Sequence, residues 1–420
     1  MRALYSGVSG IRAHQTRMDV IGNNIANVNT TGFKASRVTF TDVFNQTLSS
    51  GSALTNPQQI GLGVAVGSTD LITDPGAFQM TGRAFDLAIS GEGLFIVEDA
   101  SGARLYTRAG GLDWNPQGVL INPALGMRVL GWMPDENGEI TNTDQANLRP
   151  IQITRGMVSL PEATTYVTLK GNLDAAAQSN DTYETVITVY DSLGRPVEIT
   201  IKFTKSDANT WEVDFWDPEA GDWSDLGDLE FDEYGKLVID PTAYDPTDPT
   251  SLPPGTMKIT IQDPDQRAAD LEILVDFSKI TQAYDASGRS TVELDTRDGR
   301  PMGTLEALYV NEFGQIIGRF SNGDSKILAQ IALAYFNNPA GLIKEGTSTY
   351  AESPASGAPQ IGLPGTGGRG TLVPGNLEGS NVDLAQQFTD MILTQRGYQA
   401  SARVVSVADD MLQEIVNLKR

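Results

Sequence analysis

The two ends of the chain carry apolar residues at a spacing that predicts helices. Near each terminus, these residues recur every seven positions. A seven-residue repeat places side chains on one narrow stripe of a helix, which is the pattern of a coiled-coil seam. We therefore predict a helix within residues 1–32 and another within 377–420. Their predicted assembly seam consists of Leu4, Ile11, Met18, Ile25, Leu384, Met391, Tyr398, Val405 and Leu412.

Neither predicted helix is favourable in isolation. Gly7, Gly10 and Gly22 each cost about 1 kcal/mol relative to alanine in a helix interior. A helix of this length also gains most of its stability from packing rather than from propensity. We expect the seam to be filled by the other end of the chain, by neighbouring chains, or by both. The alternative is that each helix is an ordinary surface helix that packs on the chain's own hydrophobic core. The presence of an apolar stripe at both termini argues against this alternative.

Between the ends, short segments with alternating apolar and polar residues predict β-structure. Residues 197–203 and 211–215 alternate in this way around a turn at 206–209, which predicts a hairpin. Similar short segments recur between Gly, Pro, Asn and Asp turns. The predicted fold is therefore mainly β with helical termini. It has paired N- and C-terminal coiled-coil helices and two antiparallel β-domains, the second inserted in the first.

Composition marks the predicted domain boundaries. Residues 354–376 are rich in glycine and proline, and residues 33–70 carry few strand signals, so both segments are predicted to be connectors. The predicted organisation is the N-terminal helix of an inner-tube domain (1–32), a connector (33–70), the first β-domain (71–158 and 295–353), the inserted outer β-domain (159–294), a second connector (354–376) and the C-terminal helix (377–420).

Charge and composition exclude several classes of function. The 30 basic and 53 acidic residues give a net charge of −23, which opposes binding to nucleic acids and to anionic membranes. The chain has no cysteine, which excludes disulfides and thiolate metal sites. We find no apolar run long enough to span a membrane, and the N-terminus lacks the pattern of a cleavable signal.

A search for catalytic chemistry leaves few candidates. The single histidine, His14, has neither a nucleophile nor a carboxylate at triad spacing. Acidic residues in the proline-rich segment 240–255 lack the spacing of a calcium loop. We therefore predict no catalytic residue, no cofactor and no metal. An extracellular-polymer enzyme and a surface adhesin or layer protein are the alternatives from other functional classes.

Both termini contain motifs that resemble a known family. Residues 3–10, 19–30 and 32–34 are similar to the N-terminal signature of the bacterial flagellar rod and hook proteins, and residues 379–384, 388–389, 395–396, 398–400 and 410–412 are similar to that family's other end. Segments 86–93 and 106–110 are also similar. The most characteristic motif residues are Asn23, Asn24, Ile25, Ala26, Asn27, Gly32 and Phe33.

The middle of the chain indicates which member of the family this is. Residues 189–194, followed by the strand at 197–203 and by Trp211, resemble the inserted outer domain of the hook subunit. Most rod members are too short for such a domain, and a distal rod protein is the alternative. The resemblance implies a homo-oligomeric helical tube, which is flexible, curved and transmits torque from rod to filament.

The resemblance also implies partners and a location. Expected partners are a hook cap scaffold, the distal rod, the hook–filament junction proteins and the flagellar type III export apparatus. The expected location is the extracellular part of the bacterial flagellum, at the basal body and hook, reached without a cleaved signal peptide. Neither nucleic acid nor membrane insertion is expected.

Overall fold

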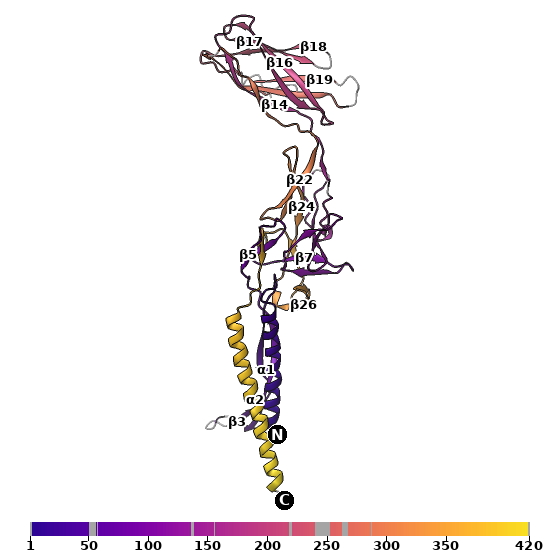
Figure 1. Ribbon diagram of the computed structural model, residues 1–420, viewed down its shortest axis with the longest axis vertical. Coiled ribbons are helices and arrows are strands. Elements are labelled where there is room, and N and C mark those ends of the chain that lie inside the picture. The colour runs from indigo at the N-terminus through magenta and orange to yellow at the C-terminus, as the bar shows by residue number, and fades with distance from the viewer. Residues whose placement is uncertain are drawn as a thin grey trace. The chain divides into compact units, whose positions relative to one another are not determined.

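The computed structural model describes residues 2–49, 56, 58–135, 138–154, 156–217, 221–239, 253–262, 268–286 and 288–418. These residues form two long helices, one near each terminus, and many short strands (Figure 1). The chain divides into two compact units. Unit 1 comprises Met1–Arg155, Ala307–Gly318 and Ser325–Arg420, and unit 2 comprises Gly156–Glu306 and Arg319–Asp324. The predicted class, mainly β with helical termini and an inserted second domain, is confirmed.

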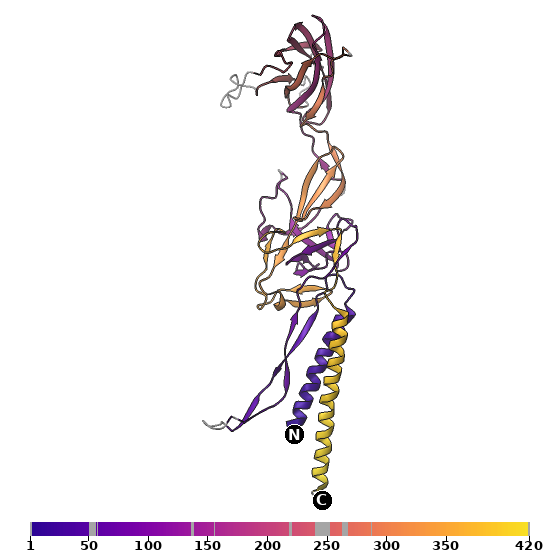
Figure 2. The same ribbon diagram turned by 90° about the vertical axis from the view of Figure 1, so that its left-hand side faces the viewer.

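Helices α1 (Arg2–Ala26) and α2 (Leu384–Leu418) lie side by side and run in opposite directions (Figures 1 and 2). Asp383 caps α2, because its Oδ1 accepts hydrogen bonds from the backbone N–H groups of Ala385 at 2.8 Å and Gln386 at 3.2 Å. After α1 the chain turns and reaches Gly32, whose φ is +68°. Within the described residues, neither helix is long and apolar enough to cross a membrane.

Residues 33–70, predicted as a connector, contain a two-stranded ribbon. Strand β1 (Ser36–Asp42) pairs antiparallel with β4 (Val64–Leu71), and β2 (Asn45–Ser49) pairs antiparallel with β3 (Gln58–Gly61). Few side chains of these strands are buried, so the sequence lacks the apolar alternation that identifies a half-buried strand. The ribbon lies along α1 (Figure 2).

The β-structure of unit 1 surrounds a core of buried side chains, which include Phe95, Ile96, Leu130 and Trp132. Its strands are β5 (Phe78–Met80), β6 (Leu87–Ser90), β7 (Leu94–Glu98), β8 (Arg104–Thr107), β9 (Asp113–Trp114), β10 (Leu120–Asn122), β11 (Met127–Trp132), β12 (Arg149–Pro150), β24 (Ser325–Ile331), β25 (Leu333–Tyr335), β26 (Ile343–Gly346), β27 (Thr349–Ala351), β28 (Gln360–Gly362), β29 (Thr371–Pro374) and β30 (Asn376–Glu378). Two 3₁₀ turns, Gln145–Asn147 and Pro339–Gly341, complete it.

The glycine- and proline-rich segment 354–376, predicted as a connector, also forms strands. Within and just after it, β28 pairs with β25, β29 with β6, and β30 with β5. Each of these strands has only three or four residues between turns. A strand this short shows no measurable alternation in the sequence, which is why the pattern does not predict it. Strand β30 leads the chain towards α2.

Unit 2 is built from two four-stranded sheets, in the orders β15-β16-β17-β18 and β19-β20-β14-β21. The predicted hairpin is present as β16 and β17, with Ile201 opposite Phe215. One pair differs from the antiparallel prediction, because β14 and β20 are parallel. Parallel strands need a long crossover, which local turn signals do not reveal.

The inward side chains of the two sheets of unit 2 form one apolar cluster, with Phe203, Trp211 and Phe277 at most 1% exposed. The strands of this unit are β13 (Val158–Ser159), β14 (Tyr166–Asp174), β15 (Thr182–Tyr190), β16 (Pro196–Asp207), β17 (Thr210–Asp217), β18 (Asp222–Glu230), β19 (Thr256–Ile261), β20 (Leu271–Ala283) and β21 (Glu293–Arg297). Strands β22 (Gly303–Val310) and β23 (Gln315–Phe320) carry the chain between the units. Most of the proline-rich loop 240–255 lies outside the described residues.

Candidate assembly site

Small residues make the close contact between α1 and α2. Gly7 and Gly10 are buried on α1. A Cβ on Gly7 would lie 2.8 Å from Cγ2 of Val405, and a Cβ on Gly10 would lie 2.8 Å from Oγ of Ser401. Glycine allows the two backbones to approach this closely. The glycines that weaken an isolated α1 are therefore the residues that let it pair with α2.

Of the predicted seam residues, Val405 lies against Gly7 in this contact, and every one of the nine keeps part of its side chain accessible. Exposure is 39% for Leu384 and 36% for Tyr398, and the other seven seam residues are half-buried. A single copy therefore leaves part of each seam side chain accessible to a neighbouring chain. Their role in contacts between copies stays a prediction.

Helix α2 also presents a second apolar stripe that the seam prediction missed. Leu393, Val404, Val407 and Met411 are between 45% and 59% exposed. A seven-residue interval separates Val404 from Met411, and twice that interval separates Leu393 from Val407, so the repeat was available in the sequence. Apolar side chains this accessible on a helix indicate a face that is covered in an assembly.

The single histidine packs at the crossing of the two helices and the ribbon. His14 lies edge-on to Phe40 of β1, with ring centroids 5.5 Å apart. A Cβ on Gly397 of α2 would lie 2.5 Å from its Cε1 atom. Its Nδ1 atom is buried and has no hydrogen-bond partner within the described part of the chain. Burial, and then the nearby Arg17 guanidinium, lower the pKa of His14.

This environment predicts a pH-dependent helix pair. The pKa of His14 is lower in the folded chain than the value of about 6.5 in an unfolded one. The unfolded chain therefore binds the proton first as pH falls below about 6.5, and stability decreases until the lower folded pKa is passed. We expect the melting temperature of the helices, followed by circular dichroism, to fall more between pH 7.5 and 5.5 in the wild type than in His14→Gln. An equal fall in both proteins would contradict this assignment.

Where the helices join the β-structure of unit 1, three charged side chains are buried together. The side chain of Glu378 is 0% exposed and lies 2.6 Å from Nζ of Lys34 and 3.1 Å from Nη1 of Arg108. Glu378 Oε1 also accepts a hydrogen bond from the backbone N–H of Gly76 at 3.0 Å. One carboxylate therefore holds the segment after α1, the segment before α2 and the end of β8 together. We call these three charged residues the junction triad.

Backbone carbonyls accept further hydrogen bonds from the two cations of the junction triad. Lys34 Nζ donates to the carbonyl of Asp74 at 2.8 Å, and Arg108 Nη1 donates to the carbonyl of Ile89 at 3.1 Å. Burial lowers the pKa of Lys34 and of Arg108, and the Glu378 carboxylate acts in the opposite direction for both. Breaking such a buried pair from one side leaves an uncompensated charge.

Two asparagines flank the junction triad and pair with backbone groups. Asn24 Oδ1 accepts from the N–H of Ser36 at 3.0 Å, while its Nδ2 donates to Gln387 Oε1 at 3.0 Å. Asn381 Oδ1 accepts from the N–H of Ala35 at 2.8 Å. Each side-chain amide therefore links segments that are adjacent in space and distant in sequence.

The motif residues of the N-terminal signature have structural roles at this junction. Asn27 Nδ2 donates to the carbonyl of Asn23 at 2.9 Å, in the turn that ends α1. Gly32 has a positive φ, and a Cβ on it would lie 2.6 Å from the backbone nitrogen of Ala109. Phe33 is buried with an exposure of 8%. Ile25 is half-buried and Ala26 is exposed. Within the described residues, no particular side-chain contact indicates a structural role for either of them.

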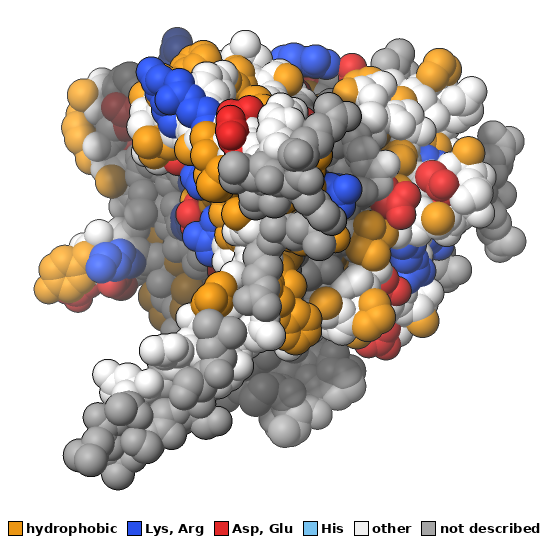
Figure 3. Space-filling model, turned by 90° about the horizontal axis from the view of Figure 1, so that it is seen from below, with side chains coloured by type: hydrophobic (Ala, Val, Ile, Leu, Met, Phe, Trp, Pro, Cys, Tyr) orange, Lys and Arg blue, Asp and Glu red, His pale blue; other side chains and the backbone are white. Residues whose placement is uncertain are grey.

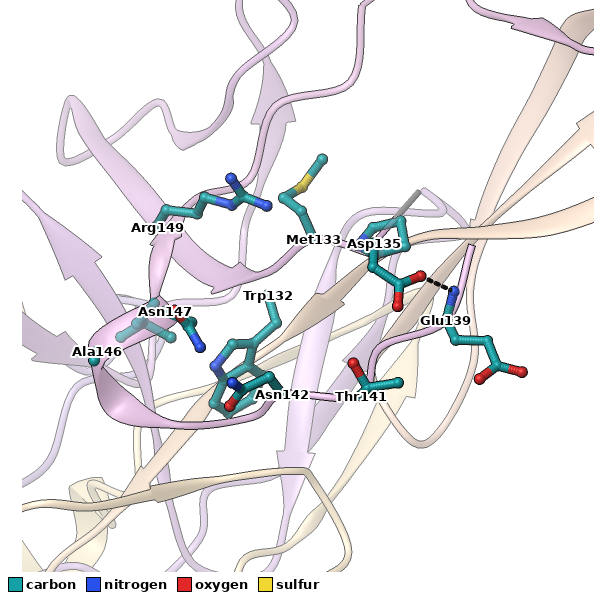
Figure 4. A pocket seen from close by; sticks show the side chains of 11 residues that line it. Trp132, Met133, Asp135, Glu139, Thr141, Asn142, Ala146, Asn147 and Arg149 are labelled. Carbon is teal, nitrogen blue, oxygen red and sulfur yellow. Dashed lines mark hydrogen bonds between the residues drawn. The ribbon is translucent and has the colours of Figure 1, made fainter. Parts of the chain in front are cut away.

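One cavity in unit 1 is lined by the loop between β11 and β12. It has a volume of about 390 Å³ and includes Trp132, Asp135, Glu139 and Arg149 (Figure 4). Asp135 Oδ1 accepts a hydrogen bond from the backbone N–H of Glu139 at 3.0 Å, so this carboxylate closes its own turn. Nothing in this lining pairs a nucleophile with a base.

One cluster of carboxylates in unit 2 has the spacing of metal ligands. Oxygen atoms of Glu212, Asp214 and Asp225 lie within 4.8 Å of one another. However, the Lys202 ammonium lies 2.7 Å from Asp214 Oδ2, so a cation already pairs with one of the three carboxylates. Its geometry does not favour a dedicated metal site.

Family descriptions match most of the chain. Residues 4–34 match "Flagella basal body rod protein", 88–172 match "Flagellar hook protein FlgE/F/G D1 domain", 159–299 match "Flagellar basal body protein FlaE D2 domain", and 373–418 match "Flagellar basal body rod FlgEFG protein C-terminal". A crystal structure of Helicobacter pylori flagellar hook protein FlgE2 covers 71% of this chain and 98% of its own, at a TM-score of 0.46 and 16% identity. That similarity is too low to support an argument.

Full-length relatives distinguish the hook from the rod. The flagellar hook proteins FlgE of Borreliella burgdorferi and Treponema pallidum are 38% and 39% identical to this chain, and each alignment covers 100% of both chains. The flagellar basal-body rod protein FlgG of Bacillus subtilis is 30% identical, also over 100% of both chains. These two hook proteins are thus more similar to the chain than this rod protein is. The chain therefore belongs to the flagellar hook protein family and is a hook subunit.

Proposed function

We propose that this subunit polymerises through its paired terminal helices into the flexible curved tube of the hook, which transmits torque from the rod to the filament. The observation that carries the proposal is the apolar face that α1 and α2 leave accessible after pairing. In the isolated chain, Tyr5, Phe388, Ile392 and Leu393 are all at least 50% exposed. Burying such side chains stabilises an assembly by about 25 cal/mol for each Å² of apolar surface.

The surface chemistry of the helix pair and of unit 2, each taken by itself, supports different roles for them in this tube. The helix pair forms the inner tube, because it leaves large apolar side chains such as Tyr5, Ile392 and Leu393 exposed. Unit 2 carries charged side chains on its outward sheet face, including Lys202 and Glu212, and makes weaker, more polar contacts there. Polar contacts exchange partners with water at little cost, which suits a tube that bends as it turns.

Replacing seam residues from both helices tests this proposal. In the double variant Ile11→Ala, Met391→Ala, we expect tube formation to be lost while unit 2 keeps its fold. The substitutions remove apolar surface from the helices and leave the core of unit 2 unchanged. Electron microscopy would score the tubes, and fluorescence of the buried Trp211 would report on unit 2. Normal tubes from this variant would refute the proposal that the seam residues hold the tube together.

The proposed partners follow from this role. They are further copies of the chain, a hook cap scaffold, the distal rod, the hook–filament junction proteins and the flagellar type III export apparatus, which would export the chain without cleaving a signal. The helices support this route, because helices that depend on packing unfold readily and order again on assembly. Immunogold labelling of residues 159–294 on the hook supports this role, and label confined to the rod favours a distal rod protein instead.

We also propose that the subunit is not an enzyme. Within the described residues, the cavity next to Trp132 lacks a paired nucleophile and base, and His14 is enclosed between α2 and β1. Assaying the purified chain against polysaccharides and peptides tests this, and turnover that survives further purification would overturn it.

A further inference from the structure

The last turns of α2 continue past the start of α1. Gly7 of α1 lies against Val405 of α2. From this contact, α1 continues 5 residues to Arg2, whereas α2 continues 13 residues to Leu418 (7 − 2 and 418 − 405). Because the helices are antiparallel, about 8 residues of α2 extend beyond α1, which is about 12 Å of helix. We call these residues, together with Asp409 and Asp410 directly before them, the overhang (409–418).

The overhang is apolar and acidic. Met411 is 56% exposed and Val416 is 66% exposed. All charged residues of the overhang are acidic, namely Asp409, Asp410 and Glu414. Figure 3, which looks at the end where both termini lie, shows hydrophobic side chains exposed among charged ones. An apolar helix end that is exposed in one copy needs a partner with an apolar surface and a positive charge.

A groove of this chemistry lies on the other side of α1. A cavity of about 360 Å³ separates α1 from the ribbon strand β4, with apolar walls that include Tyr5, Val8 and Val66. Arg12 is exposed in this lining, and within the described part of the chain its guanidinium forms no ion pair or side-chain hydrogen bond. The groove is therefore apolar, with one unpaired positive charge.

The overhang does not reach the groove of its own chain. Gly7 and Gly10 face α2, whereas Ser9 faces the ribbon and accepts a hydrogen bond from the N–H of Val64 at 3.2 Å. At 100° per residue, Ser9 is rotated by about 160° from Gly7 and about 100° from Gly10, so the ribbon and α2 contact different faces of α1. Figure 2 shows α1 between the ribbon and α2. Only a second copy can bring an overhang to this groove.

We infer that the overhang of one copy docks into the groove between α1 and β4 of the next copy, with its acidic residues around Arg12. This inference rests on the proposed polymerisation and specifies one of its contacts. The two surfaces are different patches of the same chain, so the contact is heterologous. Repeating a heterologous contact produces an open helical assembly rather than a closed dimer, as a tube requires.

Charge reversal on each surface tests the inference. The groove variant Arg12→Glu and the overhang variant Asp410→Lys, Glu414→Lys each place like charges together. We expect each variant alone to need at least about tenfold more protein than the wild type to form tubes at about 0.1 M salt. An equimolar mixture should assemble at roughly the wild-type concentration, because each overhang then meets a groove of opposite charge. Arg12→Lys, which keeps the charge, should behave like the wild type.

Light scattering and electron microscopy measure assembly, and circular dichroism confirms that each variant has the wild-type helix content. If either variant assembles like the wild type, the inference fails while the proposed function stands. If both variants fold and fail alone, but the mixture also fails, Arg12 and the overhang do not pair and the inference is overturned. A wild-type chain that forms no tubes overturns the proposed function and the inference with it.

Discussion

Replacing Glu378 with alanine should destabilise unit 1 by about 3–5 kcal/mol, because it leaves two buried cations without their counter-charge. The side chains of Lys34 and Arg108 are only 4% and 5% exposed, so water does not replace the carboxylate without opening the structure. We expect the segments joined by the triad to separate first. Hydrogen exchange measured by mass spectrometry should then increase in peptides covering residues 33–36 and 86–110.

An exposed ion pair in the same unit is the control for Glu378→Ala. Arg83 and Asp113 lie 2.9 Å apart, with side chains that are 62% and 52% exposed. Asp113→Ala should change stability by at most about 1 kcal/mol, because solvent screens this pair. If the two substitutions changed the free energy of unfolding equally, burial of the junction triad would contribute nothing to the stability of unit 1.

The same triad explains why sequence motifs in three separate segments occur together. Lys34 ends the motif at 32–34, Arg108 lies in the motif at 106–110, and Glu378 immediately precedes the motif at 379–384. Sequence reasoning identified the segments by resemblance and did not predict that they meet. Charges separated by hundreds of residues leave no local periodicity, so only the fold reveals their pairing. The sequence itself marks Glu378 only by its place directly before the motif at 379–384.

The terminal helices and the hairpin of unit 2 were predictable for the opposite reason. Long elements with one buried face repeat their apolar residues many times, as in α2 and in β16. The short strands β28, β29 and β30 are too short to show a repeat of apolar and polar residues. Their pairing partners also lie far away in the sequence. For the helix pair, periodicity indicated the helices and included Val405 of the contact, but it did not indicate that Gly7 and Gly10 pack against α2, because glycine carries no apolar side chain to repeat.

Gly397→Ala should destabilise the helix pair by about 1–3 kcal/mol, although alanine is the better helix former. The new methyl group would meet the ring of His14, with its Cβ 2.5 Å from Cε1 and 2.6 Å from Nε2. The ring is held between α2 and Phe40, so relieving the clash requires the helices to move apart. Thermal unfolding followed by circular dichroism would measure this loss.

Gly22→Ala is the matched control, because a Cβ at Gly22 meets no other atom within 4 Å. It should stabilise α1 by up to about 1 kcal/mol through helix propensity alone. The double variant His14→Ala, Gly397→Ala should recover part of the stability lost in Gly397→Ala, because the smaller side chain at position 14 removes the clash. If Gly397→Ala instead stabilises the chain as Gly22→Ala does, the helices do not pack at this distance. The glycines of both helices would then have to be explained by contacts between copies.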